Sequence, residues 1–289
     1  MKIFDTHCHP HLNHIKNTDE TIRNFFENGG IYMTVIGTDL NKNKKALEIA
    51  NKYDGVFASI GIHPCDIDGL VIEKTINEMR KVYLENKGKI VAIGECGLDY
   101  YWMEKELKPH SCPKDTPSAK FSSPFQEKEA TEKMDILKRQ QELFFIAQIE
   151  LARELSLPII IHNRESKNDV LKILQKTDFK NFIFHCYSED LEYAQKLIEF
   201  SPNCKISFSG IVTFKNAHDI QETAKNIPLK NILAETDSPY LTPTPFRGRE
   251  ENEALYTKYV IEKISELRGT DCSEEIFQNS MEIFGIKKS

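Results

Sequence analysis

The stretch IVAIGECGLD, residues 90–99, contains the pattern that decides the fold. Its first half, Ile90–Ile93, is a short apolar run rich in β-branched residues, which is typical of a buried strand. Its second half carries two carboxylates, Glu95 and Asp99, immediately after that run. An apolar run followed at once by ionisable residues recurs along the chain, and each recurrence predicts another strand of the same kind.

Eight short apolar runs predict strands, and six of them are followed by His, Asp or Glu. Longer stretches with the apolar spacing of helices lie between several of them. Strand and helix in alternation predict an α/β fold, and we expect a single TIM-type (β/α)8 barrel. A doubly wound open sheet stays as the alternative, because alternation alone does not show closure. The predicted strands are Lys2–Phe4, Tyr32–Ile36, Val56–Ile60, Ile90–Ile93, Pro158–Ile161, Phe182–Phe184, Lys205–Phe208 and Ile232–Ala234, and the predicted helices include Asn41–Tyr53, Gln140–Leu155, Asp169–Gln175 and Leu191–Phe200.

The length fits one barrel domain over residues 1–289, since such barrels take about 250 residues and tolerate insertions. The interval between the fourth and fifth predicted strands is much longer than the others. It contains four prolines among lysines, serines and glutamates, from Pro109 to Pro124. This composition predicts an inserted surface loop after strand four, at about residues 101–125, followed by a long helix from about Glu127 to Leu155.

The composition limits the class of protein. With 40% hydrophobic and 28% charged residues, the chain is neither disordered nor fibrous. No apolar run approaches 18 residues, so no membrane span and no membrane partner are expected. The N-terminus lacks a signal-peptide pattern and the seven cysteines are an odd number, so a cytoplasmic location is expected, with the nucleus as the alternative. The net charge of −6 argues against non-specific coating of nucleic acid but leaves room for a local phosphate-binding cleft.

Most of the predicted strands end in His, Asp or Glu. In a barrel these ends converge on one mouth, where barrel enzymes place their active sites. Four imidazoles and two carboxylates buried there without partners would cost several kcal/mol. Divalent cations remove that cost, and six ligands suit two cations, the arrangement of two-metal hydrolysis. The residues concerned are His7, His9, Glu95, His162, His185 and Asp237.

His7 and His9 lie two apart on an extended segment, so both side chains leave the same face and can hold one cation. Taken alone, the pair is more typical of an ordinary polar loop than of a metal site, and Glu95 alone would be typical of a buried ion pair. The convergence of all six residues favours the metal site.

Five ordered blocks extend this pattern into a resemblance. The chain resembles the TatD-related metal-dependent deoxyribonucleases, a family of amidohydrolase-like barrels, from Ile3 to about Phe284. The resemblance implies a TIM-type barrel that hydrolyses DNA phosphodiesters, expected to act as an exonuclease. The blocks are DTHCH at residues 5–9, GIHP at 61–64, IGECGLDY at 93–100, HNRE at 162–165 and ETDSPYL at 235–241.

Carried over by position, the resemblance assigns His7 and His9 to one metal and His162 and His185 to the other. Glu95 would bridge the two ions. Asp237 would bind metal and also serve as the base, so Glu95 and Asp237 are the expected catalytic residues. Two divalent ions are therefore implied as cofactors, with Mg²⁺ expected and Mn²⁺ or Zn²⁺ as alternatives.

Three further residues are candidates for substrate binding. Arg164 and Arg247 could each hold a phosphate in bidentate fashion, or form a salt bridge at the rim. His63 could donate a hydrogen bond to a phosphate or support the site structurally. Beyond these three, the neighbouring Trp102 and Tyr100–Tyr101 could stack on a base or pack under the insertion.

DNA is the expected partner, as substrate, and no obligate protein partner is evident. Two other functions remain open from the residues alone. The same metals would serve hydrolysis of a small amide, lactone or ester. A binding protein that has lost turnover is the third possibility, against which the presence of all six expected ligands counts.

Overall fold

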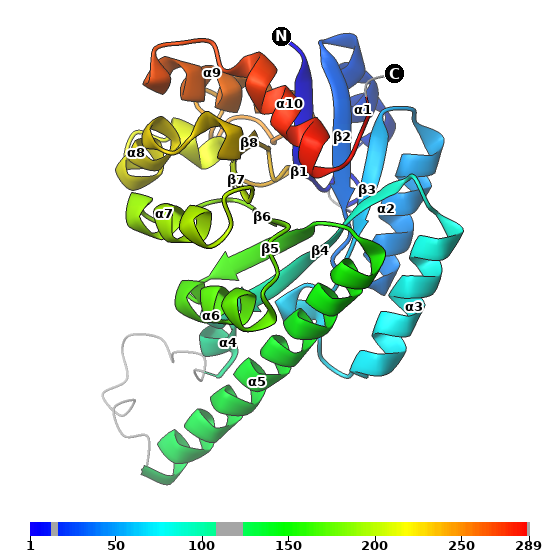
Figure 1. Cartoon of the computed structure of the whole chain (residues 1–289), viewed down its shortest axis with the longest axis vertical. Helices are drawn as coiled ribbons and strands as arrows, with labels where there is room; N and C mark the ends of the chain where they lie inside the picture. The colour runs from blue at the N-terminus through cyan, green and yellow to red at the C-terminus, as the bar shows by residue number, and fades with distance from the viewer. Residues whose placement is uncertain (13–16, 108–123, 288–289) are drawn as a thin grey trace.

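The computed structural model describes residues 1–12, 17–107 and 124–287. Eight parallel strands pair in chain order, β1 to β8, and form a nearly closed barrel with helices on its outside (Figure 1). The predicted TIM-type barrel is therefore confirmed, since a doubly wound sheet would not keep the strands in sequential order. The strands are β1 (Ile3–Cys8), β2 (Gly30–Ile36), β3 (Val56–Ile60), β4 (Ile90–Asp99), β5 (Ile159–Arg164), β6 (Phe182–Phe184), β7 (Lys205–Phe208) and β8 (Ile232–Ala234).

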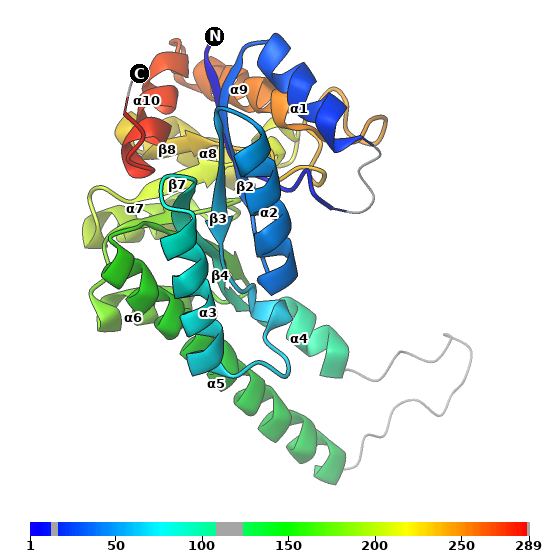
Figure 2. The same cartoon turned by 90° about the vertical axis from the view of Figure 1, so that its right-hand side faces the viewer.

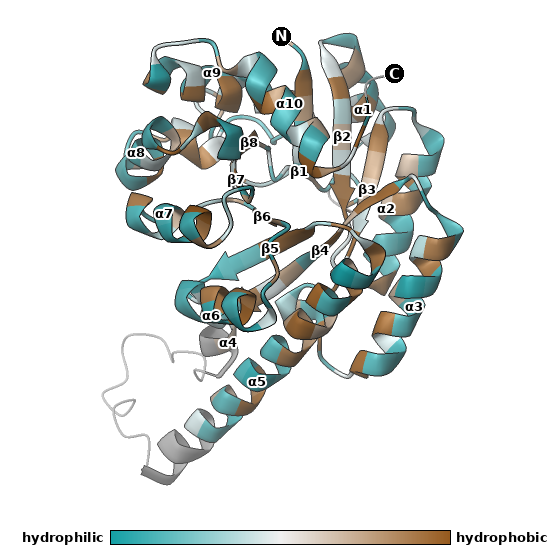
Figure 3. Cartoon of the chain, viewed as in Figure 1, coloured by the Kyte–Doolittle hydropathy of each residue, from teal (hydrophilic) through white to brown (hydrophobic). Residues whose placement is uncertain are grey.

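The helices surround this barrel (Figure 2), and most of them show both hydrophilic and hydrophobic residues along their turns (Figure 3). Such amphipathic helices bury one face against the sheet and leave the other in water. Short 3₁₀ turns, at Pro64–Asp66, Gly210–Thr213, Leu229–Asn231 and Ala254–Tyr256, complete the connections. The helices are α1 (Thr18–Glu27), α2 (Leu40–Lys52), α3 (Ile72–Glu85), α4 (Tyr100–Leu107), α5 (Pro124–Leu155), α6 (Lys167–Thr177), α7 (Leu191–Phe200), α8 (His218–Asn226), α9 (Thr257–Arg268) and α10 (Ser273–Ile283).

Side chains at the helix ends fix where several helices begin and end. The Asp39 carboxylate accepts the backbone N–H groups of Asn41 and Lys42 at the start of α2. Asp190 caps α7 in the same way by accepting the N–H of Tyr193. Gly269 ends α9 with a φ of 68°, a left-handed conformation that glycine adopts without steric cost.

The barrel closes between its first and last strands. A parallel bridge joins Cys8 to Ser238, just beyond the end of β8. The N–H of Asp237 donates to the carbonyl of His7 over 2.9 Å, and the N–H of His9 donates to that of Ser238 over 2.8 Å. These bonds place the end of β1 directly beside the segment that follows β8.

The opposite end of the barrel is plugged by apolar side chains. Phe4 of β1 packs against Phe284, with ring centroids 5.5 Å apart, and belongs to a buried cluster with Phe277 and Met281 of α10. Burying such side chains contributes about 1.5–3 kcal/mol each. Helix α10 therefore seals this end, and polar chemistry is confined to the other end.

The insertion after β4 begins with a helix rather than with the irregular loop predicted from residue 101. The Asp99 carboxylate accepts the N–H of Trp102 over 2.9 Å, which starts α4. Tyr100 and Met103, three residues apart, are buried on one face. Helix α5 begins at Pro124, close to the predicted start, and extends beyond the barrel (Figures 1 and 2). The predicted loop at residues 108–123 lies outside the described residues.

Within the described ranges, no helix is long and apolar enough to cross a membrane.

Candidate metal centre

The six predicted ligands come together at the carboxyl ends of the strands. His7 lies within β1 and His9 directly follows it, while Glu95 and His162 lie within β4 and β5. His185 and Asp237 follow β6 and β8. Parallel strands bring all these ends to one mouth.

Glu95 lies at the centre of the group and its side chain is almost completely buried. Its Oε2 atom lies 3.5 Å from His7 Nε2 and 3.9 Å from His9 Nε2. Its Oε1 atom lies 2.8 Å from both His162 Nδ1 and His185 Nε2. The two oxygens of one carboxylate therefore face two different pairs of imidazoles.

The first pair converges with Asp237. The Nε2 atoms of His7 and His9 are 3.2 Å apart, and Asp237 Oδ1 lies 3.6 Å from the former and 3.4 Å from the latter. Burial opposes ionisation of Asp237, but its contact with His9 and the nearby imidazoles outweigh burial and lower its pKa. Asp237 is thus ionised at neutral pH, and 16% of its side chain is exposed at the mouth.

Two carboxylates that were not among the predicted ligands lie beside the second pair. His162 Nε2 lies 3.0 Å from Asp99 Oδ2. His185 Nδ1 lies 3.4 Å from Glu235 Oε1, which also accepts the N–H of Cys186 over 2.6 Å. Both carboxylates occur within the strand-end blocks, and that position was the signal available in the sequence.

The two pairs are linked by stacked rings. His7 and His185 lie parallel, with an interplanar angle of 8° and centroids 4.0 Å apart. Burial and the neighbouring His185 lower the pKa of His7. Burial also opposes protonation of His185, but Glu95 and Glu235 outweigh it and raise that pKa well above the usual value. Of the two stacked rings, His185 therefore holds a proton more tightly.

Charge balance keeps Glu95 ionised in spite of its burial. Desolvation alone would raise its pKa, but His185, His162 and His7 together lower it well below the usual value. Three buried polar atoms of the centre remain without a hydrogen-bond partner among the described residues, namely His7 Nδ1, His185 Nδ1 and Glu235 Oε2.

Among the residues that the structure describes, three overlapping groups could hold a metal ion, because the ligand atoms of each group lie within 4.8 Å of one another. Nitrogen and carboxylate oxygen together suit Zn²⁺, Mn²⁺ and related divalent ions. The groups are His7, His9 and Glu95; His7, His185 and Glu235; and His63, Glu95 and His162.

His63 lies against the centre rather than at the rim. Its Nδ1 accepts the N–H of Cys65 over 3.1 Å, which leaves Nε2 facing Glu95 Oε1 at 3.7 Å. Burial and the nearby His162 lower its pKa to about 3, so the ring is neutral.

The two candidate arginines are held by aromatic rings. The guanidinium of Arg164 lies 4.0 Å from the ring centroid of Tyr101, and that of Arg247 lies 3.8 Å from that of Phe214. Neither forms the predicted alternative, a rim salt bridge, with any carboxylate in the described part of the chain. Their N–H edges are therefore not engaged by an acidic partner there.

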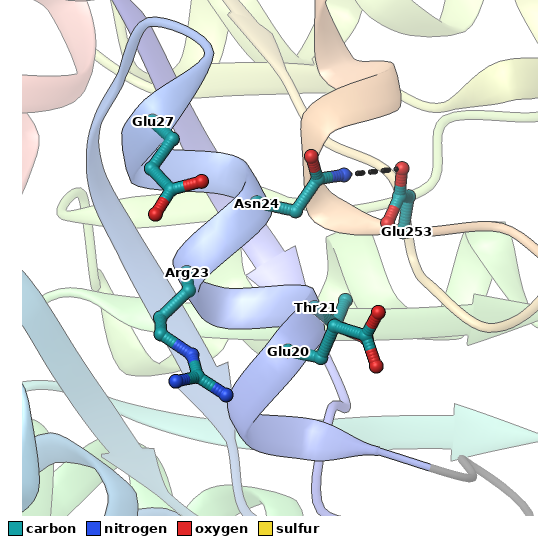
Figure 4. Close-up of a pocket in the computed structure, with 6 residues that line it drawn as sticks. All are labelled: Glu20, Thr21, Arg23, Asn24, Glu27 and Glu253. Atoms are coloured by element: carbon teal, nitrogen blue, oxygen red, sulfur yellow. Dashed lines mark hydrogen bonds between the residues drawn. The ribbon is translucent and has the colours of Figure 1, made fainter.

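A separate hollow of about 630 Å³ lies on the outer side of α1 (Figure 4). Asn24 Nδ2 donates to Glu253 Oε1 across it over 3.0 Å. Its lining includes none of the predicted site residues.

Comparison with known proteins matches residues 4–285 to the family described as TatD related DNase. The chain is also 36% identical to the uncharacterized metal-dependent hydrolase YabD of Bacillus subtilis, over 92% of this chain and 91% of that protein. The chain belongs to the TatD-related DNase family.

Other relatives agree with this placement. The TatD-family chain is 31% identical to the uncharacterized metal-dependent hydrolase YcfH of Escherichia coli, over 95% of this chain and 91% of that protein. It superposes on the crystal structure of the TatD homologue YJJV of Escherichia coli with a TM-score of 0.79 at 21% identity, covering 99% and 98% of the two chains. The resemblance predicted from the five blocks is confirmed, and the protein is a hydrolase of this family.

Proposed function

We propose that this TatD-family hydrolase cleaves DNA phosphodiester bonds from strand ends with the help of two divalent metal ions. The observation that carries the proposal is Glu95, whose Oε2 faces His7 and His9 while its Oε1 faces His162 and His185. A carboxylate with histidines on both of its oxygens has the donor arrangement of a bridging ligand.

The donor set fits metal ions on its own chemistry. His7 and His9 bring two Nε2 atoms within 3.2 Å of each other beside two ionised carboxylates, Glu95 and Asp237. Two Nε2 atoms this close either share one N–H or turn their lone pairs towards a common cation, and the ionised carboxylates beside them favour the cation. On the other side, Asp99 forms a hydrogen bond with His162, and Glu235 lies 3.4 Å from His185 Nδ1, which approaches the carboxylate–histidine arrangement common at metal sites.

We assign His7, His9 and Asp237 to one ion, His162 and His185 to the other, and Glu95 to both. When bound, the ions supply positive charge that acidifies a water molecule and offsets charge on the phosphate. Asp237 is ionised and partly exposed at the mouth, so it can accept the proton that the water loses. Glu95, which is deeper, holds the histidines in place.

The groups around the mouth suit a phosphodiester better than a small uncharged ester or amide. Arg164 and Arg247 keep N–H edges that no carboxylate in the described ranges occupies, and guanidinium groups bind phosphate in bidentate fashion. His63 carries its N–H on the nitrogen that faces the centre. Because Glu95 is only 4% exposed, a strand end reaches the site more readily than the middle of a duplex does.

The test offers the purified protein, with Mg²⁺ or Mn²⁺, an end-labelled linear DNA strand, a circular DNA of the same sequence, and a panel of small esters and amides. We expect stepwise shortening of the linear strand only, and its loss on chelation. Glu95→Gln should abolish cleavage, whereas Glu85→Gln, on the exposed surface of α3, serves as the matched control.

Each other result has a clear meaning. Cleavage of the circle would overturn the exonuclease mode. Turnover of an ester or amide without cleavage of DNA would overturn the nuclease assignment in favour of a small-molecule hydrolase.

A further inference from the structure

A second group of side chains lies beside the metal-ligand centre and takes no part in it. Arg164 is the last residue of β5, two positions after His162, and pairs in register with Asp99 of β4. Its guanidinium lies 4.0 Å from the ring centroid of Tyr101 and 5.5 Å from that of Trp102. We call Tyr101, Trp102 and Arg164 the stacking group.

The stacking group is built from elements that also build the centre. The Asp99 side chain contacts His162 through Oδ2 and caps the N–H of Trp102 through Oδ1. One carboxylate therefore fixes both a predicted metal ligand and the start of the helix that carries the two rings. This shared support places the stacking group on the His162 side of the mouth.

The composition of the group points to a ligand with a flat face and a negative charge. Tyr101 and Trp102 meet edge to face, with centroids 5.4 Å apart, and 45% of Trp102 is exposed. Large aromatic side chains exposed beside a cationic group are the feature on which nucleic-acid-binding proteins stack unpaired bases. Arg164, stacked on Tyr101, keeps its N–H edges for a phosphate.

Space for such a ligand adjoins the group. A hollow of about 670 Å³ lies beside the group, and its lining includes the cationic Lys138, Arg164, Lys167 and Lys172 as well as the acidic Glu165, Asp169 and Glu189. The Lys138 ammonium lies 4.4 Å from the ring centroid of Tyr100, and Lys167 is paired with Glu189 over 3.0 Å. Arg164 both contacts the rings of Tyr101 and Trp102 and lines the hollow, so it joins the two.

We propose that the stacking group holds an unpaired nucleotide next to the one being cut, with its base on Trp102 and its phosphate on Arg164. The inference rests on the proposed function, since that nucleotide belongs to the strand being cleaved. The stacking group adds a nucleotide-binding position to the proposed nuclease site. It also explains why unpaired ends would be preferred, because a base within a duplex has no free face to stack on Trp102.

Trp102 is the single tryptophan of the chain, so its fluorescence reports directly on this position. The probe is a short single-stranded oligonucleotide with phosphorothioate linkages, added in Mg²⁺ so that binding is observed without rapid cleavage. We expect saturable quenching by the single strand and much weaker quenching by a blunt duplex of the same sequence. Binding of the single strand, detected by its own anisotropy, with unchanged Trp102 fluorescence would overturn the proposal.

Variants provide the second measurement. Trp102→Ala should raise KM for a single strand about tenfold with little change in kcat, the size expected for one lost base stack. Trp102→Phe should retain most of the affinity. Leu84→Ala removes a comparably exposed apolar side chain at the far end of α3 and is the control. Equal KM values for Trp102→Ala and Leu84→Ala would overturn the proposal.

The two proposals fail in different ways. DNA cleavage without Trp102 quenching would refute the stacking position and leave the nuclease function standing. Quenching without cleavage of DNA under any metal would refute the nuclease function while the nucleotide-binding position remains.

Discussion

The two sides of Glu95 are built differently. On one side, His7 and His9 come from a single strand end and meet Asp237 across the closure of the barrel. On the other, His162 and His185 come from separate strands, and each is backed by a second carboxylate. The pKa of His7 is lowered, whereas those of His162 and His185 are raised.

This difference indicates a division of labour. Carboxylates behind a histidine fix its orientation and make it a stronger ligand, so the His162–His185 side is suited to tight metal binding. The His7–His9 side has the more exposed Asp237, which in the proposed function accepts a proton from water at the mouth. The following variants separate the two sides, beginning with the largest expected effect.

Glu95→Ala should abolish turnover, because its loss disturbs both sides at once. Removing even one strong electrostatic contact at an active site costs roughly 100-fold or more. Cleavage rate and metal content are measured on the same preparation, with the exposed Glu85→Ala as control. Activity within about tenfold of the parent would place the reaction elsewhere.

Asp237→Asn should reduce the cleavage rate by about 10²–10⁴-fold while much of the metal is retained. Asparagine keeps the size and an oxygen ligand but cannot accept the proton. Metal analysis beside a single-turnover assay separates binding from chemistry. A near-normal rate would exclude Asp237 as the base. Loss of both ions would show that Asp237 is needed for metal binding, and its role as base would then not be supported by this variant.

His162→Ala should weaken one ion and leave the His7–His9 side occupied. Activity should therefore return in part as the metal concentration is raised. Calorimetric titration with Mn²⁺ checks the stoichiometry against the parent protein. An unchanged stoichiometry and affinity would show that His162 is not a ligand.

Asp99→Asn should have the smallest effect, a loss of about 10- to 100-fold in metal affinity on the His162 side. The amide oxygen still faces His162, but the negative charge is gone. Asp178→Asn, an exposed change at the end of α6, is the matched control. If the metal affinity of the His7–His9 side falls by the same factor, the two sides of Glu95 do not bind metal independently.

The sequence predicted the fold and the six central residues because both depend on strand order. An apolar run followed by His, Asp or Glu specifies a parallel strand and the end at which its polar residue appears. Asp99 and Glu235 were missed as supports for His162 and His185, although both occur in the blocks. Which ring nitrogen faces which carboxylate depends on side-chain rotation and on strand stagger, and neither is visible in the spacing.

Helix α4 shows a second limit. The prolines and lysines of the insertion outweighed the helical signal of the first eight residues after Asp99. The contact that starts the helix is the hydrogen bond from the Trp102 N–H to the Asp99 carboxylate. In the sequence, an aspartate at the end of a strand cannot be recognised as a helix cap, because a metal ligand would occupy the same position. Asp99 both contacts His162 and caps helix α4, whereas sequence analysis assigns one role to each residue.

The closure between Cys8 and Ser238 has a consequence for synthesis of the chain. The parts of the centre become available in the order in which the ribosome makes them. Glu95, His162 and His185 can assemble while the last strand is still being synthesised, but Asp237 reaches His7 and His9 only after β8 has docked on β1. The complete centre thus awaits about the last fifth of the 289-residue chain, and a prematurely terminated polypeptide would lack Asp237, the base that we propose.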